Sequence, residues 1–158
     1  MFPRTVRLHP VYHRLLARGL AAVALVGIAL VHLMQLPHTW EESPALGAMF
    51  AVLVVAATVA SGAIVSFDNR LVWLTAVLIG AAPIAGYVLT RSTTVPFAAD
   101  DVGNWLEPAG LAALFLEAWL IALGANTLRP AFWPETTEDD AAARNPHAGA
   151  SSAPPSMK

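Results

Sequence analysis

Long apolar runs, separated by short polar segments, fill most of the chain. A helix needs about 20 apolar residues to cross the hydrocarbon core of a bilayer, and lipid offers a non-helical backbone no hydrogen-bond partners. Four runs come close to that length: residues 15–36, 46–67, 71–90 and 106–128. The pattern therefore predicts an all-α, polytopic membrane protein with four transmembrane helices.

The connections between these runs predict an up-down bundle. The turn at residues 68–70 is short enough to join the second and third runs as an antiparallel hairpin. Pro37 ends the first predicted helix, and the polar segment 38–44 follows it as a loop. Residues 91–105 form the longest internal loop. Each helix is therefore expected to run antiparallel to the one before it.

Basic residues are unevenly distributed between the two ends of the predicted bundle. The first loop contains no Lys or Arg and the second contains only Arg91. The opposite end carries Arg4, Arg7, Arg14, Arg18, Arg70 and Arg129. Because short cytoplasmic flanks collect positive charge, both termini are predicted to be cytoplasmic. The expected location is the cytoplasmic membrane of a bacterium.

Three regions follow from this pattern. Residues 1–14 are a basic cytoplasmic lead, and residues 15–128 are the transmembrane domain. Residues 129–158 are rich in Pro, Ala and Ser, carry an acidic cluster and show no apolar periodicity. That composition is typical of a disordered tail, which is predicted to lie in the cytoplasm.

Composition narrows the class of function. Hydrophobic residues make up 56% of the chain and charged residues 13%, about half the charged share of a soluble protein. The net charge of −2 gives no reason to expect a nucleic-acid partner. The absence of cysteine excludes disulfides, iron–sulfur clusters and thiolate zinc sites. The common phosphate-binding and hydrolase motifs are also missing, so the protein is not expected to be an enzyme.

Glu117 is the residue least expected at its position. It lies about ten residues into the fourth run, about 15 Å below the outer end and near the midplane. An ionisable group there costs at least about 2.5 kcal/mol, so it should face protein or water. Gly110, Ala113 and Gly124 share its face and allow a second helix to approach closely. Two interpretations stay open: a proton, cation or ligand site, or a carboxyl group that fixes helix packing through a hydrogen bond.

A second polar cluster is predicted at the outer face. His32 lies about one turn below the outer end of the first run, and Gln35 shares its face. The other members come from the two outer loops and their flanks: His38, Glu41, Glu42, Arg91, Asp100, Asp101 and Glu107. Imidazole together with carboxylate suits a divalent transition metal, for which His32, His38 and Glu107 are the candidate ligands. The alternative is an interfacial His32 that pairs with Glu107 or a carbonyl group.

Helical rise places His32 about 6 Å and Glu117 about 15 Å below the outer surface. The gap of about 9 Å is long for direct contact but short enough for a water-bridged relay. A haem with two histidine ligands needs two imidazoles inside the membrane, and only His32 qualifies. The cofactor is therefore unknown, with none as the expectation and a transition metal or a single-histidine haem as alternatives.

Part of the second half of the chain resembles small four-helix bacterial membrane proteins of unassigned function. The resemblance rests on segments 86–91, 101–108 and 110–111 together with Glu117, and it covers residues 80–125. It implies the four-helix fold and no activity. The positions to which it draws attention are Arg91, Trp105, Glu107 and Glu117.

Three functional hypotheses follow. The first is a non-enzymatic accessory or binding component of a membrane complex, whose partners are the lipid bilayer and either another protein or further copies of itself. The second is an oligomeric transporter or channel that uses Glu117 for protons or cations. The third is a redox component that binds a metal or haem.

Overall fold

The computed structural model describes residues 10–96 and 98–132, with side chains from residue 12 to residue 129 except at residues 97 and 100. Regular structure in this part is helical: α1 Pro10–Glu42, α2 Pro44–Ser66, α3 Arg70–Ser92, the 3-10 turn η1 Ala99–Asp101 and α4 Pro108–Phe132. The chain divides into two units, residues 1–128 and 129–158. Most of the predicted basic lead and of the predicted tail, residues 1–9 and 133–158, lies outside the described residues.

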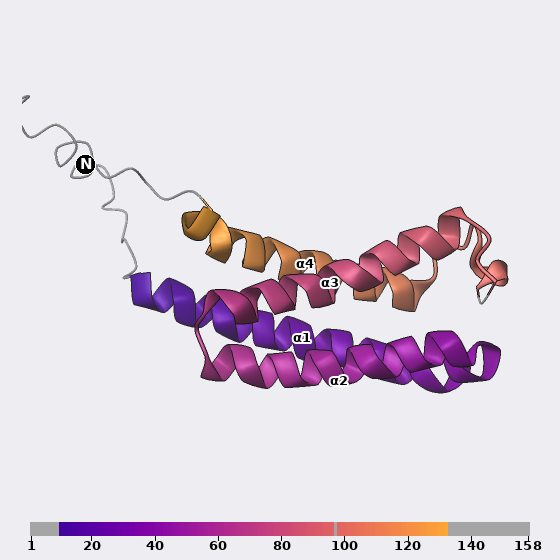
Figure 1. Cartoon of the computed structure of the whole chain (residues 1–158), viewed down its shortest axis with the longest axis horizontal. Coiled ribbons are helices and arrows are strands. Elements are labelled where there is room, and N and C mark those ends of the chain that lie inside the picture. The colour runs from indigo at the N-terminus through magenta and orange to yellow at the C-terminus, as the bar shows by residue number, and fades with distance from the viewer. Residues whose placement is uncertain (1–9, 97, 133–158) are drawn as a thin grey trace, which may run out of the picture. The chain divides into compact units, whose positions relative to one another are not determined.

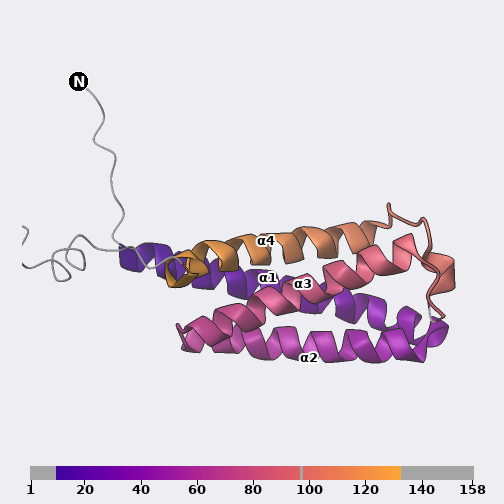
Figure 2. The same ribbon diagram turned by 45° about the horizontal axis from the view of Figure 1, so that its top comes forward.

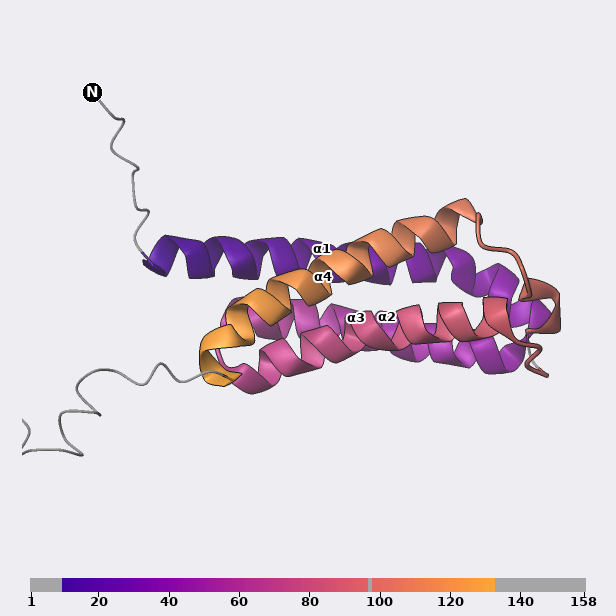
Figure 3. The ribbon, with the colours of Figure 1, turned by 90° about the horizontal axis from the view of Figure 1, so that it is seen from above.

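Each of the four α-helices is long and apolar enough to cross a membrane, so the four predicted helices are confirmed. Successive helices alternate in direction (Figures 1 and 2). The α1–α2 connection and η1 lie together at what we call the η1 end (Figure 3). The turn at residues 67–69 lies at the opposite end, which we call the α2–α3 end.

The first helix is longer than the sequence predicted. α1 continues through Pro37 to Glu42, so the expected loop at residues 38–44 is wrong. A proline inside a helix removes one backbone hydrogen bond, and apolar helices tolerate that loss when their neighbours support them. The chain turns instead at Ser43, whose side chain caps α2 by accepting a hydrogen bond from the backbone N–H of Leu46. Pro44 then takes the first helical position, where a missing N–H costs nothing.

Ser43 is the single residue between α1 and α2, and Gly47 allows the sharp joint. A Cβ atom at Gly47 would lie 2.6 Å from the ring of Trp40 and 2.9 Å from its Cα atom. A larger residue at this position would push α1 away from α2. The two helices pack extensively against each other below the joint.

Glycines also bring α3 and α4 together. A Cβ atom at Gly80 would lie 3.0 Å from the carbonyl oxygen of Glu117, so the two backbones almost touch there. Gly110 and Gly124 likewise leave no room for a Cβ atom beside side chains of α3. The predicted packing of the face that carries Gly110 and Gly124 is therefore confirmed, with α3 as the neighbouring helix.

The centre of the bundle is apolar. Side chains from all four α-helices are at most 2% exposed there: Ala21, Ala24, Leu25, Ile28, Ala57, Ile64, Trp73, Ala76 and Leu120. Other large apolar side chains point outward, and those of Val23, Val52 and Leu78 are between 67% and 70% exposed. Apolar surface on the outside of an apolar core suits a lipid surrounding.

Hydrogen bonds from side chains stabilise the helix termini at the α2–α3 end. Arg18 donates to the carbonyl oxygens of Ile64, at 2.8 Å, and of Val65. These carbonyls belong to the last turn of α2, where a helix leaves its own acceptors without partners. Asp68 accepts a hydrogen bond of 3.3 Å from the indole N–H of Trp73. The polar groups at this end therefore bind helix termini and the turn between them.

Candidate functional site

Glu117 lies in the middle of α4 and is 1% exposed, so of the two surroundings expected from the sequence, protein or water, it faces protein. Among the described residues, its Oε1 atom is the one buried side-chain nitrogen or oxygen without a hydrogen-bond partner. The alternative interpretation, a hydrogen bond to a neighbouring helix, is therefore not found at Oε1. A buried polar atom left without a partner costs about 1–3 kcal/mol. Burial of the Glu117 carboxyl group therefore reduces stability unless Oε1 gains a hydrogen-bond partner.

His32 of α1 faces Glu117 across the bundle. Its Nε2 atom lies 3.8 Å from Oε1 of Glu117, which is beyond hydrogen-bond distance, and the two side chains are 7% and 2% exposed. Its Nδ1 atom lies 2.9 Å from the carbonyl oxygen of Ile28. The ring of Phe50 from α2 packs at a steep angle against the imidazole, with 4.8 Å between the ring centres. Three helices thus meet at His32.

The contact with Ile28 determines what the imidazole offers to Glu117. A carbonyl oxygen only accepts hydrogen bonds, so Nδ1 carries a hydrogen and donates it. In the neutral ring, Nε2 then presents a lone pair to the carboxyl group. A carboxylate presents lone pairs as well. The contact therefore becomes attractive only when a proton resides on one of the two atoms.

His32 and Glu117 lie at similar depth, which corrects the separation expected from the sequence. The expected gap of about 9 Å assumed that α1 ends at Pro37. Because α1 runs to Glu42, His32 lies ten residues before the end of its helix. Glu117 lies nine residues after α4 begins at Pro108. His32 is therefore a buried residue rather than an interfacial one, and the carbonyl that it binds belongs to its own helix.

Arg91 organises the η1 end. At the last turn of α3, its guanidinium donates to the carboxylates of Glu107, at 3.1 Å, and Asp101, at 3.2 Å, and to the carbonyl oxygen of Asn104, at 3.3 Å. The same group lies over the ring of Tyr87, 4.2 Å from its centre. Only 10% of the Arg91 side chain is exposed. These partly buried contacts hold the segment that follows α3 against the end of that helix.

Gln35 connects this end of the bundle to α1. Its Nε2 atom donates to Oε1 of Glu107 at 2.6 Å. Gln35 follows His32 by three residues, which is about one helical turn. We refer to Gln35, Arg91, Asp101 and Glu107 as the η1 cluster. The structure thus brings together four of the predicted residues, of which Gln35 lies about one turn of α1 from His32.

Other predicted members of the outer cluster lie elsewhere. His38 pairs with Glu42 along α1 at 3.2 Å, with side chains 74% and 65% exposed, and Glu41 is exposed too. The cause is again the continuation of α1, which turns this segment into the outer surface of a helix. The side chain of Asp100 lies outside the described residues.

The three predicted metal ligands do not come together. In the part of the chain that the structure describes, no three His, Asp or Glu side chains form a group that could hold a metal ion. His32, His38 and Glu107 therefore do not form the expected ligand set. At His32, Nδ1 is hydrogen-bonded to the carbonyl oxygen of Ile28, and Nε2 faces the carboxyl group of Glu117 at 3.8 Å.

Three residues of the site were not predicted. Phe50 lies in an apolar run, and nothing local distinguishes it from residues that face outward. Thr90 is buried beside Arg91, accepts its hydrogen bond at 2.9 Å and donates to the Tyr87 carbonyl at 3.2 Å. Gly80 did carry a signal, because a glycine inside an apolar helix marks a place where a second helix can approach.

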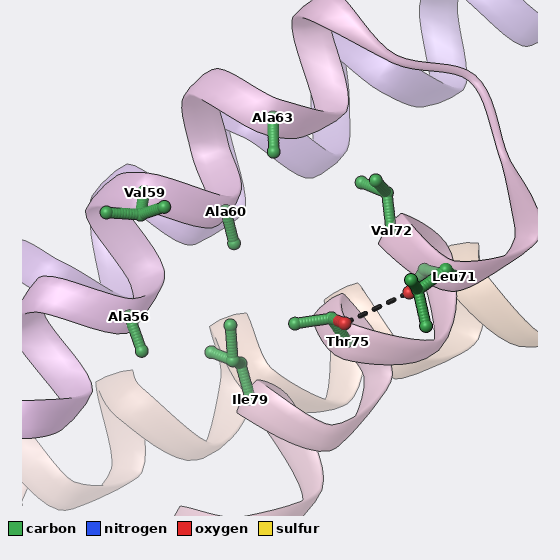
Figure 4. A pocket seen from close by; sticks show the side chains of 8 residues that line it. All are labelled: Ala56, Val59, Ala60, Ala63, Leu71, Val72, Thr75 and Ile79. Atoms are coloured by element: carbon green, nitrogen blue, oxygen red, sulfur yellow. Dashed lines mark hydrogen bonds between the residues drawn. The ribbon is translucent and has the colours of Figure 1, made fainter.

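An apolar pocket of about 340 Å³ lies between α2 and α3, apart from these residues (Figure 4). Its lining is Ala56, Val59, Ala60, Ala63, Leu71, Val72, Thr75 and Ile79. The hydroxyl of Thr75 already donates to the carbonyl oxygen of Leu71 at 3.0 Å. The pocket therefore offers apolar contacts.

The candidate site thus has two parts, a buried imidazole–carboxyl pair and a cluster of charged and amide groups at the η1 end. No protein-family model, no curated protein and no solved structure matches the chain. The resemblance to small four-helix bacterial membrane proteins therefore stays a prediction, and the site is interpreted from its own chemistry.

Proposed function

We propose that the protein crosses the cytoplasmic membrane of a bacterium four times, with both termini in the cytoplasm and the η1 end outside. The four long apolar helices support the membrane location. The distribution of arginine supports the orientation, because Arg14, Arg18 and Arg70 lie at the α2–α3 end and Arg91 at the other.

Variants with a single introduced cysteine test this topology. The chain contains no cysteine of its own, so the introduced residue is the one thiol that a reagent can label. Leu106 at the η1 end is 81% exposed and Phe67 at the α2–α3 end is 60% exposed. On intact cells, a membrane-impermeant thiol reagent should label Leu106→Cys and leave Phe67→Cys unlabelled until the membrane is opened. The reverse pattern, or labelling of both, contradicts the proposed orientation.

Within this topology, the function that the geometry supports best is a non-enzymatic accessory or binding component with an intramembrane polar site. The observation that carries it is the buried Oε1 atom of Glu117, which faces His32 and has no hydrogen-bond partner. An ionisable group inside a membrane bundle is expensive and is usually retained for function. A bound proton or hydrogen-bonding ligand would remove the cost.

Native mass spectrometry of the full chain extracted in detergent tests this role. The wild-type protein should carry a bound molecule or a further subunit that the Glu117→Gln variant binds more weakly, since the amide replaces the carboxyl group at constant shape. A Leu78→Ala variant, changed at an outward-facing position that is 67% exposed, is the matched control and should behave as wild type. Identical spectra for wild type and Glu117→Gln contradict the binding role.

Proton or cation transport is the second candidate. It is favoured by the hydrogen bond from Gln35 to Glu107, which extends polar groups from the η1 end toward the buried pair. Four helices are few for a transport path, so this candidate requires an oligomer. Proteoliposomes that contain the oligomer should then show a proton or cation flux that Glu117→Gln abolishes, and a strict monomer without flux contradicts transport.

A further inference from the structure

The two halves of the bundle on either side of the His32–Glu117 pair differ in chemistry. Toward the η1 end, Gln35 lies one turn along α1 and binds Glu107, which in turn binds Arg91. The side chains of Glu107 and Asp101 are 30% and 33% exposed, so this cluster has contact with solvent. Polar groups therefore extend from the surface to within a turn of the pair.

Toward the α2–α3 end, the pair is followed by tightly packed apolar side chains. Ile28 lies one turn from His32 on α1, and Leu120 lies about one turn from Glu117 on α4; both are 0% exposed. Others continue the apolar layer: Leu25, Ile64, Trp73 and Ala76. The Ser61 hydroxyl in this half donates at 3.4 Å to the Ala22 carbonyl. A water molecule would have no comparable series of polar groups to follow here.

Few charges lie on α2, α3 and α4 around the pair. The sequence of α2 contains no charged residue, and α3 has charges only at its ends, Arg70 and Arg91. Between Pro108 and Arg129, α4 carries only Glu117. On α1, Arg14 and Arg18 lie toward the α2–α3 end, and the exposed Glu41 and Glu42 lie toward the η1 end. The η1 cluster adds two carboxylates and one guanidinium to the η1 end. That excess of negative charge attracts a cation, and a proton is the smallest.

We propose that His32 and Glu117 share one proton, and that this proton exchanges with water only through the η1 end. The proton resides on Oε1 or on Nε2, because the facing lone pairs of a carboxylate and a neutral imidazole need one proton between them. It comes from water at the η1 cluster and returns there. This inference rests on the proposed membrane function and goes beyond the bound molecule or subunit, because it concerns the proton at the same site.

One-sided exchange makes the pair a detector of proton activity on the outer side of the membrane. Loading or removing the proton changes the charge between α1 and α4, where Gly80 holds α3 close to the backbone of Glu117. A single chain cannot pass the proton onward through the apolar layer. The inference therefore favours binding over transport for the monomer.

The reaction of Glu117 with dicyclohexylcarbodiimide tests the proposal. This apolar reagent crosses membranes and reacts with protonated carboxyl groups: the acid proton moves to a carbodiimide nitrogen and the carboxyl oxygen bonds to the central carbon. Wild-type protein in sealed vesicles is treated while the pH inside and outside is set independently. Mass spectrometry then measures modification of Glu117. The Leu106→Cys variant, labelled in a parallel vesicle preparation, identifies which side carries the η1 end.

The rate of modification should rise as the pH on the η1 side falls, by up to about tenfold per pH unit, because each unit changes proton activity tenfold. Changing the pH on the α2–α3 side should leave the rate unchanged. Glu117→Gln should show no modification at position 117, and Phe67→Cys, remote from the site, should react as wild type.

A rate that follows the pH of the α2–α3 side, or of both sides, overturns one-sided exchange. The absence of modification at every pH overturns the shared proton. Neither result affects the mass-spectrometric test of ligand or subunit binding, so failure of this inference and failure of the proposed function are separate outcomes.

Discussion

The two ends of the bundle use arginine in different ways. At the α2–α3 end, Arg18 donates to carbonyl oxygens in the last turn of α2, and Arg14, 66% exposed, pairs with Asp68. At the η1 end, Arg91 is 10% exposed and binds Glu107 as one of two carboxylate partners. One end completes the hydrogen bonding of a helix terminus. The other holds charged groups next to a buried imidazole–carboxyl pair.

The difference shows what distinguishes a structural polar group from a candidate functional one in an apolar bundle. The contacts at the α2–α3 end satisfy acceptors that every helix terminus leaves open. The Oε1 atom of Glu117, by contrast, is buried and lacks a hydrogen-bond partner. Polar groups whose hydrogen bonding is complete contribute to stability, whereas a buried polar group without a partner is a candidate for a functional role.

The largest expected effect on stability comes from Gly80, where α3 contacts α4 between the two ends of the bundle. Gly80→Leu places a side chain where even a Cβ atom would lie 3.0 Å from the Glu117 backbone. We expect a loss of about 3 kcal/mol in the free energy of unfolding, because the backbone of α4 must move. Gly62→Leu is the control, since a Cβ atom there meets nothing within 4 Å. Equal stability of the two variants in detergent would show that α3 and α4 are not in close contact.

Removing the two arginines compares the ends directly. Arg91→Ala should reduce the free energy of unfolding by about 2 kcal/mol, because the carboxylates that it binds are partly buried and lose their partner. Arg14→Ala should change it by less than about 0.5 kcal/mol, because that ion pair is exposed. Chemical denaturation in a mixed micelle measures both. A greater loss for Arg14→Ala would reverse the comparison.

Replacing Gln35, the member of the η1 cluster that lies on α1, should have a smaller effect on stability. It should also change proton exchange at Glu117. Gln35→Leu removes the 2.6 Å hydrogen bond to Glu107 and should cost about 1 kcal/mol. It should also slow the carbodiimide reaction of Glu117, because an apolar side chain interrupts the polar groups. Leu33→Ala, at an outward position on the same helix that is 49% exposed, serves as control. An unchanged reaction rate in Gln35→Leu would show that Gln35 is not on the path.

The smallest effect is expected at His38. His38→Gln removes an exposed pair with Glu42, and the free energy of unfolding should change by less than about 0.5 kcal/mol. Proton exchange at Glu117 should also be unchanged. A clear loss of stability, or a clear change in proton exchange at Glu117, would mean that the exposed part of α1 belongs to the site.

The four helices could be predicted because hydropathy is a sum over about 20 residues and tolerates single exceptions. The end of α1 could not, because a proline ends a helix in water but is tolerated where neighbouring helices support the backbone. That one error at Pro37 moved His32 toward the surface and placed His38 in a loop. The separation of His32 from Glu117 was wrong for the same reason.

The candidate site was predictable in part. A carboxyl group near the middle of an apolar run must face protein or water rather than lipid, and the structure shows that Glu117 faces protein. The pairing of Gln35 with Glu107 did not, because it depends on how α1 and α4 cross. The missing partner at Oε1 is likewise a property of packing, and no sequence pattern reports it.

The distance between His32 and Glu117 is the most direct test of the central claim that these two side chains form one site. Full-length protein in lipid nanodiscs, with ¹⁵N in histidine and ¹³C in the glutamate carboxyl groups, allows their dipolar coupling to be measured by solid-state NMR. A strong coupling is expected between His32 Nε2 and the Glu117 carboxyl carbon, consistent with 3.8 Å between Nε2 and Oε1, and it should vanish in Glu117→Leu. No coupling in the wild-type protein would contradict the pairing.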